Sequence, residues 1–239
     1  MSITTKETEI IYPDSDGEPM AESTIQYTYI TQIKGGCEAL LKNNHQAFVA
    51  GDLLWYPVKG KPNISQAPDT MIVFGRPKGH RSSYLQWEEN NIAPQIVFEI
   101  RSHNDNQTKM DNKLAFYQRY NVEEYYLFNP ENNQLTGWCR IEGILTQIES
   151  MTEWISPRLG IKFQVTENGL ELYTPDGEKF LDYVELYEAK ERERLEKERE
   201  KLGKQLIQEQ LNSTQEQLEL EKQKNAQLIA KLKALGIEL

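Results

Sequence analysis

This chain of 239 residues lacks a long apolar run and has little cysteine. No stretch of about 18 apolar residues occurs, which excludes a transmembrane helix and a membrane partner. Residues 1–16 contain no basic segment followed by an apolar one, so we expect no secretory signal. Cys37 and Cys139 are the only cysteines, a usage typical of buried thiols in a reducing compartment. These absences predict a cytoplasmic protein.

Acidic residues outnumber basic residues in residues 1–187. The net charge is −10 at pH 7. Residues 188–239 contain 11 Lys or Arg and 11 Glu, which cancel, so the whole acidic excess lies in residues 1–187. A strongly acidic surface disfavours non-specific association with a phosphate backbone. The charge distribution therefore counts against nucleic acid as a partner.

The distribution of apolar residues predicts three segments. Residues 1–19 are rich in turn formers and are interpreted as a flexible lead-in. Residues 20–187 contain all four tryptophans and enough apolar material for one core, so they form the expected globular domain. Residues 188–239 are too polar for a second core and form a charged tail. The tryptophans are Trp55, Trp87, Trp138 and Trp154.

Hydrophobic periodicity predicts an α/β fold with a mixed central sheet and helices on both faces. One or two helices are expected within residues 20–41, and another over residues 106–119, capped at its start by asparagine. A smaller antiparallel extension is expected from residues 135–175, and a long loop over residues 75–94. The predicted strands span residues 47–50, 53–56, 70–74, 95–100, 125–129, 135–140, 144–149, 161–165 and 170–174.

The tail carries a seven-residue repeat of leucine. Residues 188–201 contain 12 charges in 14 positions, and the frame of the repeat slips between Leu206 and Leu211. This pattern predicts a coiled coil that forms a homodimer. Asn225 lies in the seam, the row of repeat positions that faces the partner helix, and is expected to set the register. The alternative is a single charged helix held by pairs of side chains four residues apart. The repeat consists of Leu195 and Leu202, then Leu211, Leu218, Asn225 and Leu232, with Thr214, Glu221, Leu228 and Leu235 in a second row.

Two acids lie within or beside predicted buried strands. Asp69 precedes the strand 70–74, and Glu99 stands in the apolar run 95–100. A buried carboxylate must be paired with a cation, hydrogen-bonded or bound to a metal, because removing an unpaired charge from water costs much free energy. Two carboxylates on adjacent strands can hold Mg²⁺ or Mn²⁺ through oxygen ligands. Such an ion can activate water and stabilise charge on a phosphoryl group.

Two cations are candidates for the same site. Arg101 follows Glu99 by two residues and is therefore expected on the same strand face. Lys113 lies on the following helix and can reach back over the sheet. The alternative is that Glu99 and Arg101 form a buried structural ion pair without catalytic function.

The chain resembles the Uma2 family of predicted endonucleases, which belongs to the PD-(D/E)XK nuclease superfamily. The resemblance extends over about residues 10–190, and the charged C-terminal helix is also familiar in cyanobacterial members. It rests on residues 67–73 (Ala-Pro-Asp-Thr-Met-Ile-Val), 97–102 (Val-Phe-Glu-Ile-Arg-Ser), Lys113 with Tyr117, and 122–126 (Val-Glu-Glu-Tyr-Tyr). It implies a restriction-endonuclease-like core, metal binding by Asp69 and Glu99, and a catalytic role for Lys113.

The sequence departs from the family pattern after Glu99. Arg101 stands where leucine is usual, and Ser-His-Asn-Asp replaces a Ser-Pro-like turn. Arg101 either supplies the active-site positive charge or blocks the metal by pairing with Glu99 and Asp69. It cannot act as a base. Glu22 matches an acid that often completes such sites, and it is also an ordinary residue for a helix start.

Other polar and aromatic residues have simpler interpretations. Residues 75–83 concentrate positive charge and are either a phosphate contact or a solvated loop. His103 is close to Glu99 in sequence and is a weak candidate for supporting the site, whereas His45 and His80 are expected in surface loops. The aromatic residues could stack on bases, although packing is the favoured interpretation. These aromatics are Tyr84, Trp87, Tyr125 and Tyr126.

The expected function is metal-dependent hydrolysis of DNA phosphodiester bonds. In this hypothesis Asp69 and Glu99 hold Mg²⁺ or Mn²⁺, and Lys113 or Arg101 supplies positive charge. The alternative is a catalytically degenerate nuclease fold that acts as a dimeric interaction module through its coiled coil. The acidic domain and Arg101 favour this alternative, and a self-associating tail fits either one.

Overall fold

The computed structural model describes residues 10–15, 17 and 20–234. The predicted lead-in of residues 1–19 therefore lies largely outside the described residues, as does Leu235 of the tail. The chain divides into two units, Met1–Asp182 and Tyr183–Leu239, and each unit is described by itself.

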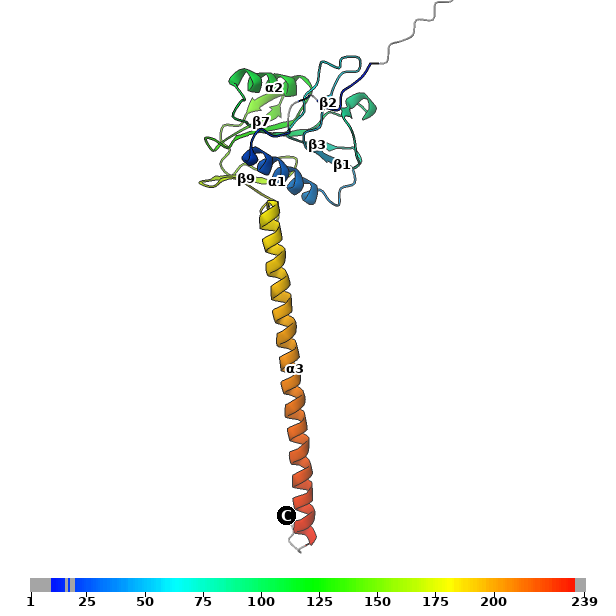
Figure 1. The fold of residues 1–239 in the computed structure, drawn as a ribbon, viewed down its shortest axis with the longest axis vertical. Helices are drawn as coiled ribbons and strands as arrows, with labels where there is room; N and C mark the ends of the chain where they lie inside the picture. The colour runs from blue at the N-terminus through cyan, green and yellow to red at the C-terminus, as the bar shows by residue number, and fades with distance from the viewer. Residues whose placement is uncertain (1–9, 16, 18–19, 235–239) are drawn as a thin grey trace, which may run out of the picture. The chain divides into compact units, whose positions relative to one another are not determined.

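A six-stranded mixed sheet forms the centre of the first unit (Figure 1). The order is β1-β3-β5-β6-β7-β8, in which β5 and β6 are parallel and the other neighbours are antiparallel. Helix α2 (Gln107–Arg119) connects the two parallel strands. The strands are β1 (Ala47–Ala50), β3 (Thr70–Phe74), β5 (Ile96–Ile100), β6 (Glu124–Asn129), β7 (Gln134–Ile141) and β8 (Ile144–Gln147).

Helices cover both faces of this sheet, as the sequence predicts (Figure 1). Helix α1 (Thr24–Leu40) packs Ile30 and Ile33 against one face, and α2 packs Tyr117 against the other. Both helices begin at side-chain caps. The Gln26 amide donates to the Ser23 hydroxyl at 3.2 Å, and the Lys109 amide donates to the Asn106 side chain at 2.8 Å. These caps fix where each helix starts relative to the strands.

Two smaller strand pairs complete the unit. Strands β9 (Lys162–Thr166) and β10 (Gly169–Tyr173) form a hairpin that packs on the same sheet face as α1. Strands β2 (Trp55–Tyr56) and β4 (Tyr84–Leu85) pair in parallel.

The antiparallel extension expected from residues 135–175 is present in two parts: β7 and β8 extend the main sheet beyond β6 by antiparallel pairing, and β9 and β10 form the hairpin. One expectation about this unit was wrong. The predicted loop 75–94 contains β4 and a short 3₁₀ helix (Gln86–Glu88), because backbone groups of this segment pair with the distant β2.

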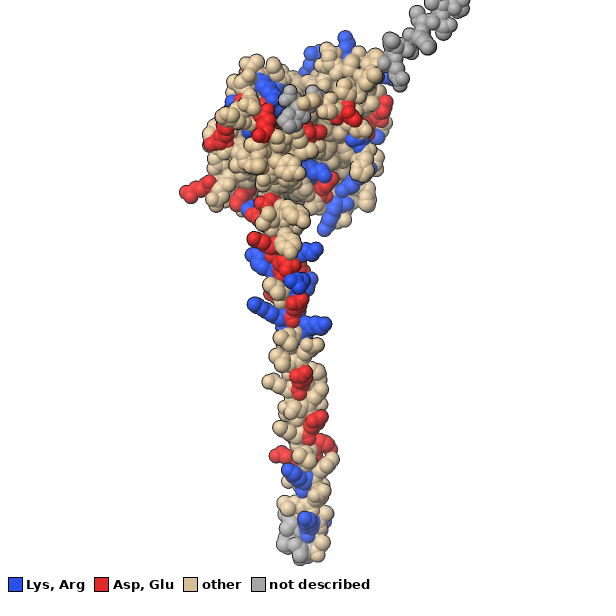
Figure 2. Space-filling view, viewed as in Figure 1, with Lys and Arg blue, Asp and Glu red and all other residues tan. Residues whose placement is uncertain are grey.

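The second unit is described as one uninterrupted helix, α3 (Tyr183–Ala234). The predicted slip in the leucine repeat does not interrupt it. Charged side chains crowd its first half, and they are more widely spaced beyond (Figure 2). Along the described chain, no helix is both long and apolar enough to cross a membrane.

Candidate active site

Asp69 and Glu99 lie side by side on the sheet face that α2 covers. Strand β3 runs antiparallel to β5 with Thr70 opposite Phe98, so the next residues, Asp69 and Glu99, are neighbours. Both are buried, with 8% and 1% of their surface exposed. The Ile100 backbone amide donates to Asp69 Oδ2 at 2.6 Å. The strand register therefore brings two carboxylates together in a buried position.

Helix α2 supplies two donors to Glu99. Lys113 Nζ lies 2.6 Å from Glu99 Oε2, and the Tyr117 hydroxyl donates to Glu99 Oε1. Lys113 and Tyr117 are four residues apart and project from the same helix face toward the sheet. Three of the predicted residues, Asp69, Glu99 and Lys113, therefore form one cluster, and Tyr117 joins them.

Burial and mutual repulsion define the electrostatics of the cluster. Burial raises the pKa of Asp69 well above its usual range, and the charge of Glu99 raises it further. Burial by itself lowers the pKa of Lys113, but the charges of Glu99 and Asp69 outweigh this effect and the net shift is upward. Burial and the charge of Glu99 also raise the pKa of Tyr117. Lys113 is therefore a permanent cation and Tyr117 a permanent donor at neutral pH.

Arg101 does not join this cluster. Strand β5 ends at Ile100, so the alternation that would place Arg101 beside Glu99 does not continue. Its Nε and Nη2 atoms donate instead to the backbone carbonyl of Asp105, at 3.2 and 3.0 Å. Among the described residues, the predicted ion pair of Arg101 with Glu99 or Asp69 is not formed. The cation paired with Glu99 is Lys113.

Asp105 organises the turn between β5 and α2. Its carboxylate accepts from the Ser102 amide at 2.9 Å and pairs with Lys109 at 2.7 Å. The side chain of Ser102 lowers the pKa of Glu22, and the charge of Lys109 contributes to the same shift. Glu22 is exposed and lies beside this turn. His103 is also exposed, and its Nδ1 lies 2.8 Å from Glu131 Oε1.

The two arginines of the basic loop of residues 75–83 share one carboxylate outside the loop. Arg76 and Arg81 both pair with Glu89, at 2.5 and 2.6 Å. The guanidinium of Arg81 also lies 3.9 Å from the centre of the Phe48 ring. Lys78 donates to the Leu41 carbonyl. A phosphate that approached these arginines would compete with Glu89 for part of their hydrogen-bonding capacity, so the loop is not simply solvated.

The aromatic residues are mainly core residues, as the packing interpretation predicts. Tyr84, Tyr125 and Tyr126 are buried. Trp87 is half-buried and packs on Tyr12 at a centroid distance of 4.9 Å. Tyr125 packs between Tyr117 and Trp138, and its buried hydroxyl has no hydrogen-bond partner among the residues that the structure describes. The charges of Glu99 and Asp69 add to the effect of burial in raising the pKa of Tyr125, which places it near the cluster.

Sequence reasoning missed Tyr117 and Asp105 as members of the site. The signal for Tyr117 was its position four residues after Lys113 on the same helix. The signal for Asp105 was its place just before the helix cap Asn106, where a carboxylate can accept backbone amides. Gln26 was also missed, and its amide donates to the Ile100 carbonyl at 2.9 Å, linking α1 to the end of β5.

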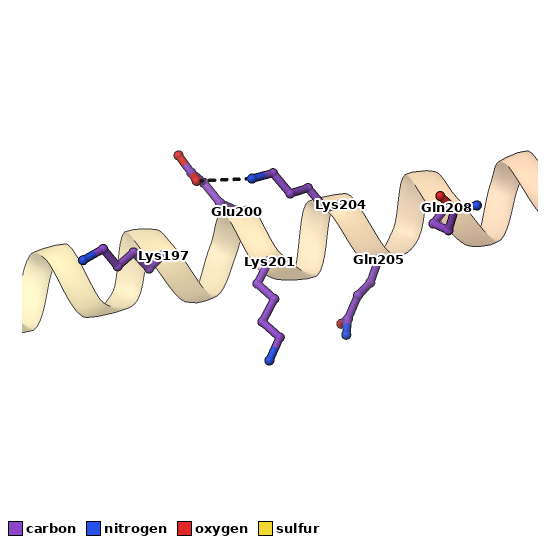
Figure 3. Close-up of a pocket in the computed structure, with 6 residues that line it drawn as sticks. All are labelled: Lys197, Glu200, Lys201, Lys204, Gln205 and Gln208. Carbon is purple, nitrogen blue, oxygen red and sulfur yellow. Dashed lines mark ion pairs between the residues drawn. The ribbon is translucent and has the colours of Figure 1, made fainter.

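Asp69 and Glu99 are the residues that could hold a metal ion. Within the residues that the structure describes, no group of three or more His, Cys, Asp or Glu is placed to bind one. A hollow along α3 is lined by side chains of that helix alone, among them Lys197 and Gln208 (Figure 3). It has no opposing wall, and we assign it no site.

Comparisons with known proteins show the family to which the chain belongs. The sequence model of the Uma2 family, described as "Putative restriction endonuclease", matches residues 11–172. No curated protein matches the chain. A solved structure described as a "putative nuclease belonging to DUF820", from Anabaena variabilis ATCC 29413, is similar at 14% identity. It covers 56% of this chain and 72% of its own, with a TM-score of 0.42.

Proposed function

Because the chain belongs to the Uma2 family of restriction-endonuclease-like proteins, we propose that it hydrolyses DNA phosphodiester bonds with Mg²⁺ or Mn²⁺ as cofactor. The observation that carries the proposal is the buried cluster of Asp69, Glu99 and Lys113. Two carboxylates and an ammonium group meet on adjacent strands and the helix that follows. The family match covers all three residues.

The composition of the cluster fits a hard divalent cation. Asp69 and Glu99 lie beside the single ammonium of Lys113, and the raised pKa of Asp69 reflects the cost of a second negative charge at this buried place; a divalent ion would offset that cost. Asp69 and Glu99 would hold the ion, and a site with only two protein carboxylates suits Mg²⁺, which keeps several waters. The Tyr125 hydroxyl, which has no hydrogen-bond partner within the described part of the chain, offers a further polar contact near the carboxylates. When bound, the ion activates water and neutralises charge on the phosphoryl group.

Lys113 has an electrostatic role in this proposal. Its raised pKa keeps the ammonium protonated, so it cannot accept a proton at neutral pH. A fixed cation beside a scissile phosphate stabilises the negative charge that develops in the transition state. It also shields Glu99 from Asp69 when the ion is absent. Lys113 is therefore the predicted catalytic cation.

Tyr117 is a positioning residue. Its hydroxyl fixes one oxygen of Glu99, while Lys113 contacts the other oxygen. The rotamer of Glu99 is thereby set by two donors from one helix. Outer contacts of this kind orient a metal ligand and tune its basicity.

The alternative function is a non-catalytic interaction module on the same fold. Its supporting observation is that Glu99 already has a cation, Lys113, and that Arg76 and Arg81 are occupied by Glu89. The acidic excess of residues 1–187 adds long-range repulsion toward DNA. In this case the cluster is a buried structural ion pair.

A cleavage assay separates the two functions. Supercoiled plasmid and single-stranded DNA are incubated with Mg²⁺, Mn²⁺ or EDTA, using wild type, Glu99→Gln and Glu124→Gln. Glu124 is the matched control, because it is equally buried, at 1% exposure, on the neighbouring strand β6.

The nuclease proposal predicts metal-dependent cleavage by wild type and by Glu124→Gln, and none by Glu99→Gln. If all three folded proteins leave both substrates intact, the interaction module becomes the favoured function. Equal cleavage by wild type and Glu99→Gln would place any nuclease activity outside this cluster.

A further inference from the structure

Helix α3 has two halves with different side-chain chemistry. In the first half, charged residues pair along the helix at spacings of three or four. Arg194 contacts Glu191 and Glu198 at 2.7 and 3.3 Å, and Lys204 lies 3.9 Å from Glu200 (Figure 3). Such pairs support a helix without a partner. This half therefore needs no second chain to remain helical.

The second half, residues 206–234, has fewer charged residues than the first and a row of exposed apolar side chains. Leu211, Leu218 and Leu228 are all exposed along the described helix. Together with Thr214, Glu221 and Asn225 they form two rows of positions, spaced alternately by three and four residues. A stripe of this spacing, left open to water, is typical of a helix that pairs with another helix.

We propose that residues 206–234 form an antiparallel coiled coil with the same segment of a second copy of this chain. The orientation follows from what each arrangement places in contact across the seam. In a parallel pair every seam residue faces its own counterpart. In an antiparallel pair, residues of one row face residues of the other row.

The polar seam residues favour the antiparallel arrangement. A parallel pair would bring the two Glu221 carboxylates together at the seam, where like charges repel. The antiparallel register that pairs Leu218 with Leu228 of the second copy also pairs Asn225 with Glu221. The asparagine amide can then donate to the carboxylate, which is a charge-assisted hydrogen bond. Both polar positions are satisfied by each other, on both sides of the dyad.

The order of charges along this half points the same way. Every acidic residue of the segment precedes every basic one. In an antiparallel pair the acidic part of one helix lies beside the basic part of the other, so opposite charges are adjacent. In a parallel pair acidic residues lie beside acidic residues and basic beside basic. The acidic residues are Glu209, Glu216, Glu219 and Glu221, and the basic residues are Lys222, Lys224, Lys231 and Lys233.

Spin-label distances in the full-length protein test the orientation. In a Cys139→Ser background, nitroxides are attached to Asn212→Cys in one protein and to Gln223→Cys in another. The register centres the dyad near residue 223. Labels at position 212 should therefore lie about 35 Å apart and labels at 223 below about 25 Å, from the helical rise of about 1.5 Å per residue. A parallel pair would give the same short distance at both positions, and either that result or the absence of dipolar coupling overturns the proposal.

Self-association itself is tested by two matched substitutions. Leu218 and Leu220 have the same exposure in the helix, 52%, but only Leu218 lies in a seam row. Sedimentation of Leu218→Glu should show dimer affinity weakened at least about a hundredfold, with Leu220→Glu unchanged. Equal effects of the two substitutions, or a wild type of monomeric or larger than dimeric mass, would contradict the proposal. Neither outcome depends on nuclease activity.

Discussion

Glu99 and Glu124 lie on neighbouring parallel strands and are equally buried, yet their surroundings differ. Glu124 faces the side of the sheet that α1 covers. It accepts from the hydroxyls of Ser156 at 2.5 Å and Tyr126 at 2.8 Å, and from the Arg158 backbone amide at 2.7 Å. These donors are neutral. Glu99 faces α2, accepts from an ammonium group and lies beside a second carboxylate.

Under the proposed function, the difference indicates which feature distinguishes a metal-binding acid from a structural one in this fold. Burial is common to both residues, so burial alone does not distinguish them. Glu124 ties the loop before β9 to the sheet, and its hydrogen bonds are complete without an ion. The Glu99 cluster brings two acids to one cation, and the raised pKa of Asp69 reflects the cost of holding both negative charges in a buried place. Such unbalanced clusters are typical of functional sites.

The largest expected effect is the loss of Lys113. Lys113→Met should reduce metal-dependent cleavage by about 100- to 1,000-fold, as for removal of one preorganised electrostatic donor. It should also destabilise the fold by about 3–5 kcal/mol, because buried carboxylates lose their partner. Cleavage rates and urea denaturation measure the two effects. Lys109→Met is the control, since its half-exposed ion pair with Asp105 contributes at most about 1 kcal/mol.

Removing the tyrosine hydroxyl that donates to each glutamate tests the difference between Glu99 and Glu124 further. Tyr117→Phe and Tyr126→Phe each take one donor from a buried glutamate. Each should destabilise the fold by about 1–3 kcal/mol, because a buried acceptor is left unsatisfied. Only Tyr117→Phe should lower activity, by about 10- to 100-fold. Equal activity of the two variants would show that Tyr117 does not position a catalytic group.

A smaller effect concerns the pH dependence of stability on the α1 side. Burial raises the pKa of Glu124 above its unfolded value, and its hydrogen bonds only partly oppose this shift. The Glu124 carboxyl group therefore makes its full contribution to stability at a pH below its pKa in the unfolded chain. This contribution is lost as the pH rises through its higher pKa in the folded protein. Glu124→Gln cannot ionise. The free energy of unfolding of wild type relative to Glu124→Gln should therefore fall as the pH rises above about 4, the ordinary pKa of a glutamate, in urea titrations. A constant difference would mean that Glu124 ionises normally in the fold.

Local sequence signals predicted much of the molecule. Asn106 as a helix cap, the spacing of apolar residues on α2 and the apolar run of β5 gave the helix and strand that carry Lys113 and Glu99. These features depend on nearby residues, and this is why they could be predicted. The proximity of Asp69 to Glu99 was also expected, but it depends on the antiparallel register of β3 with β5, two strands that are distant in the sequence.

The remaining features depend on contacts between distant segments. The end of β5 at Ile100, which turns Arg101 away from the acids, accompanies a turn held by Asp105. The pairing of β4 with β2 joins segments that no local pattern connects. Arg76 and Arg81 look free in the sequence, but the fold brings Glu89 to both. Such side-chain partners follow from tertiary packing, which overrides the local pattern.

Binding of Mn²⁺ tests the assignment of the two acids most directly. Titration followed by electron paramagnetic resonance counts the bound ions in wild type, Asp69→Asn, Glu99→Gln and Glu124→Gln. Wild type and Glu124→Gln should each bind Mn²⁺ at the same site, and the other two variants should lose this binding. Retention of the site in Glu99→Gln, or absence of binding in folded wild type, would contradict the role of Asp69 and Glu99 as metal ligands.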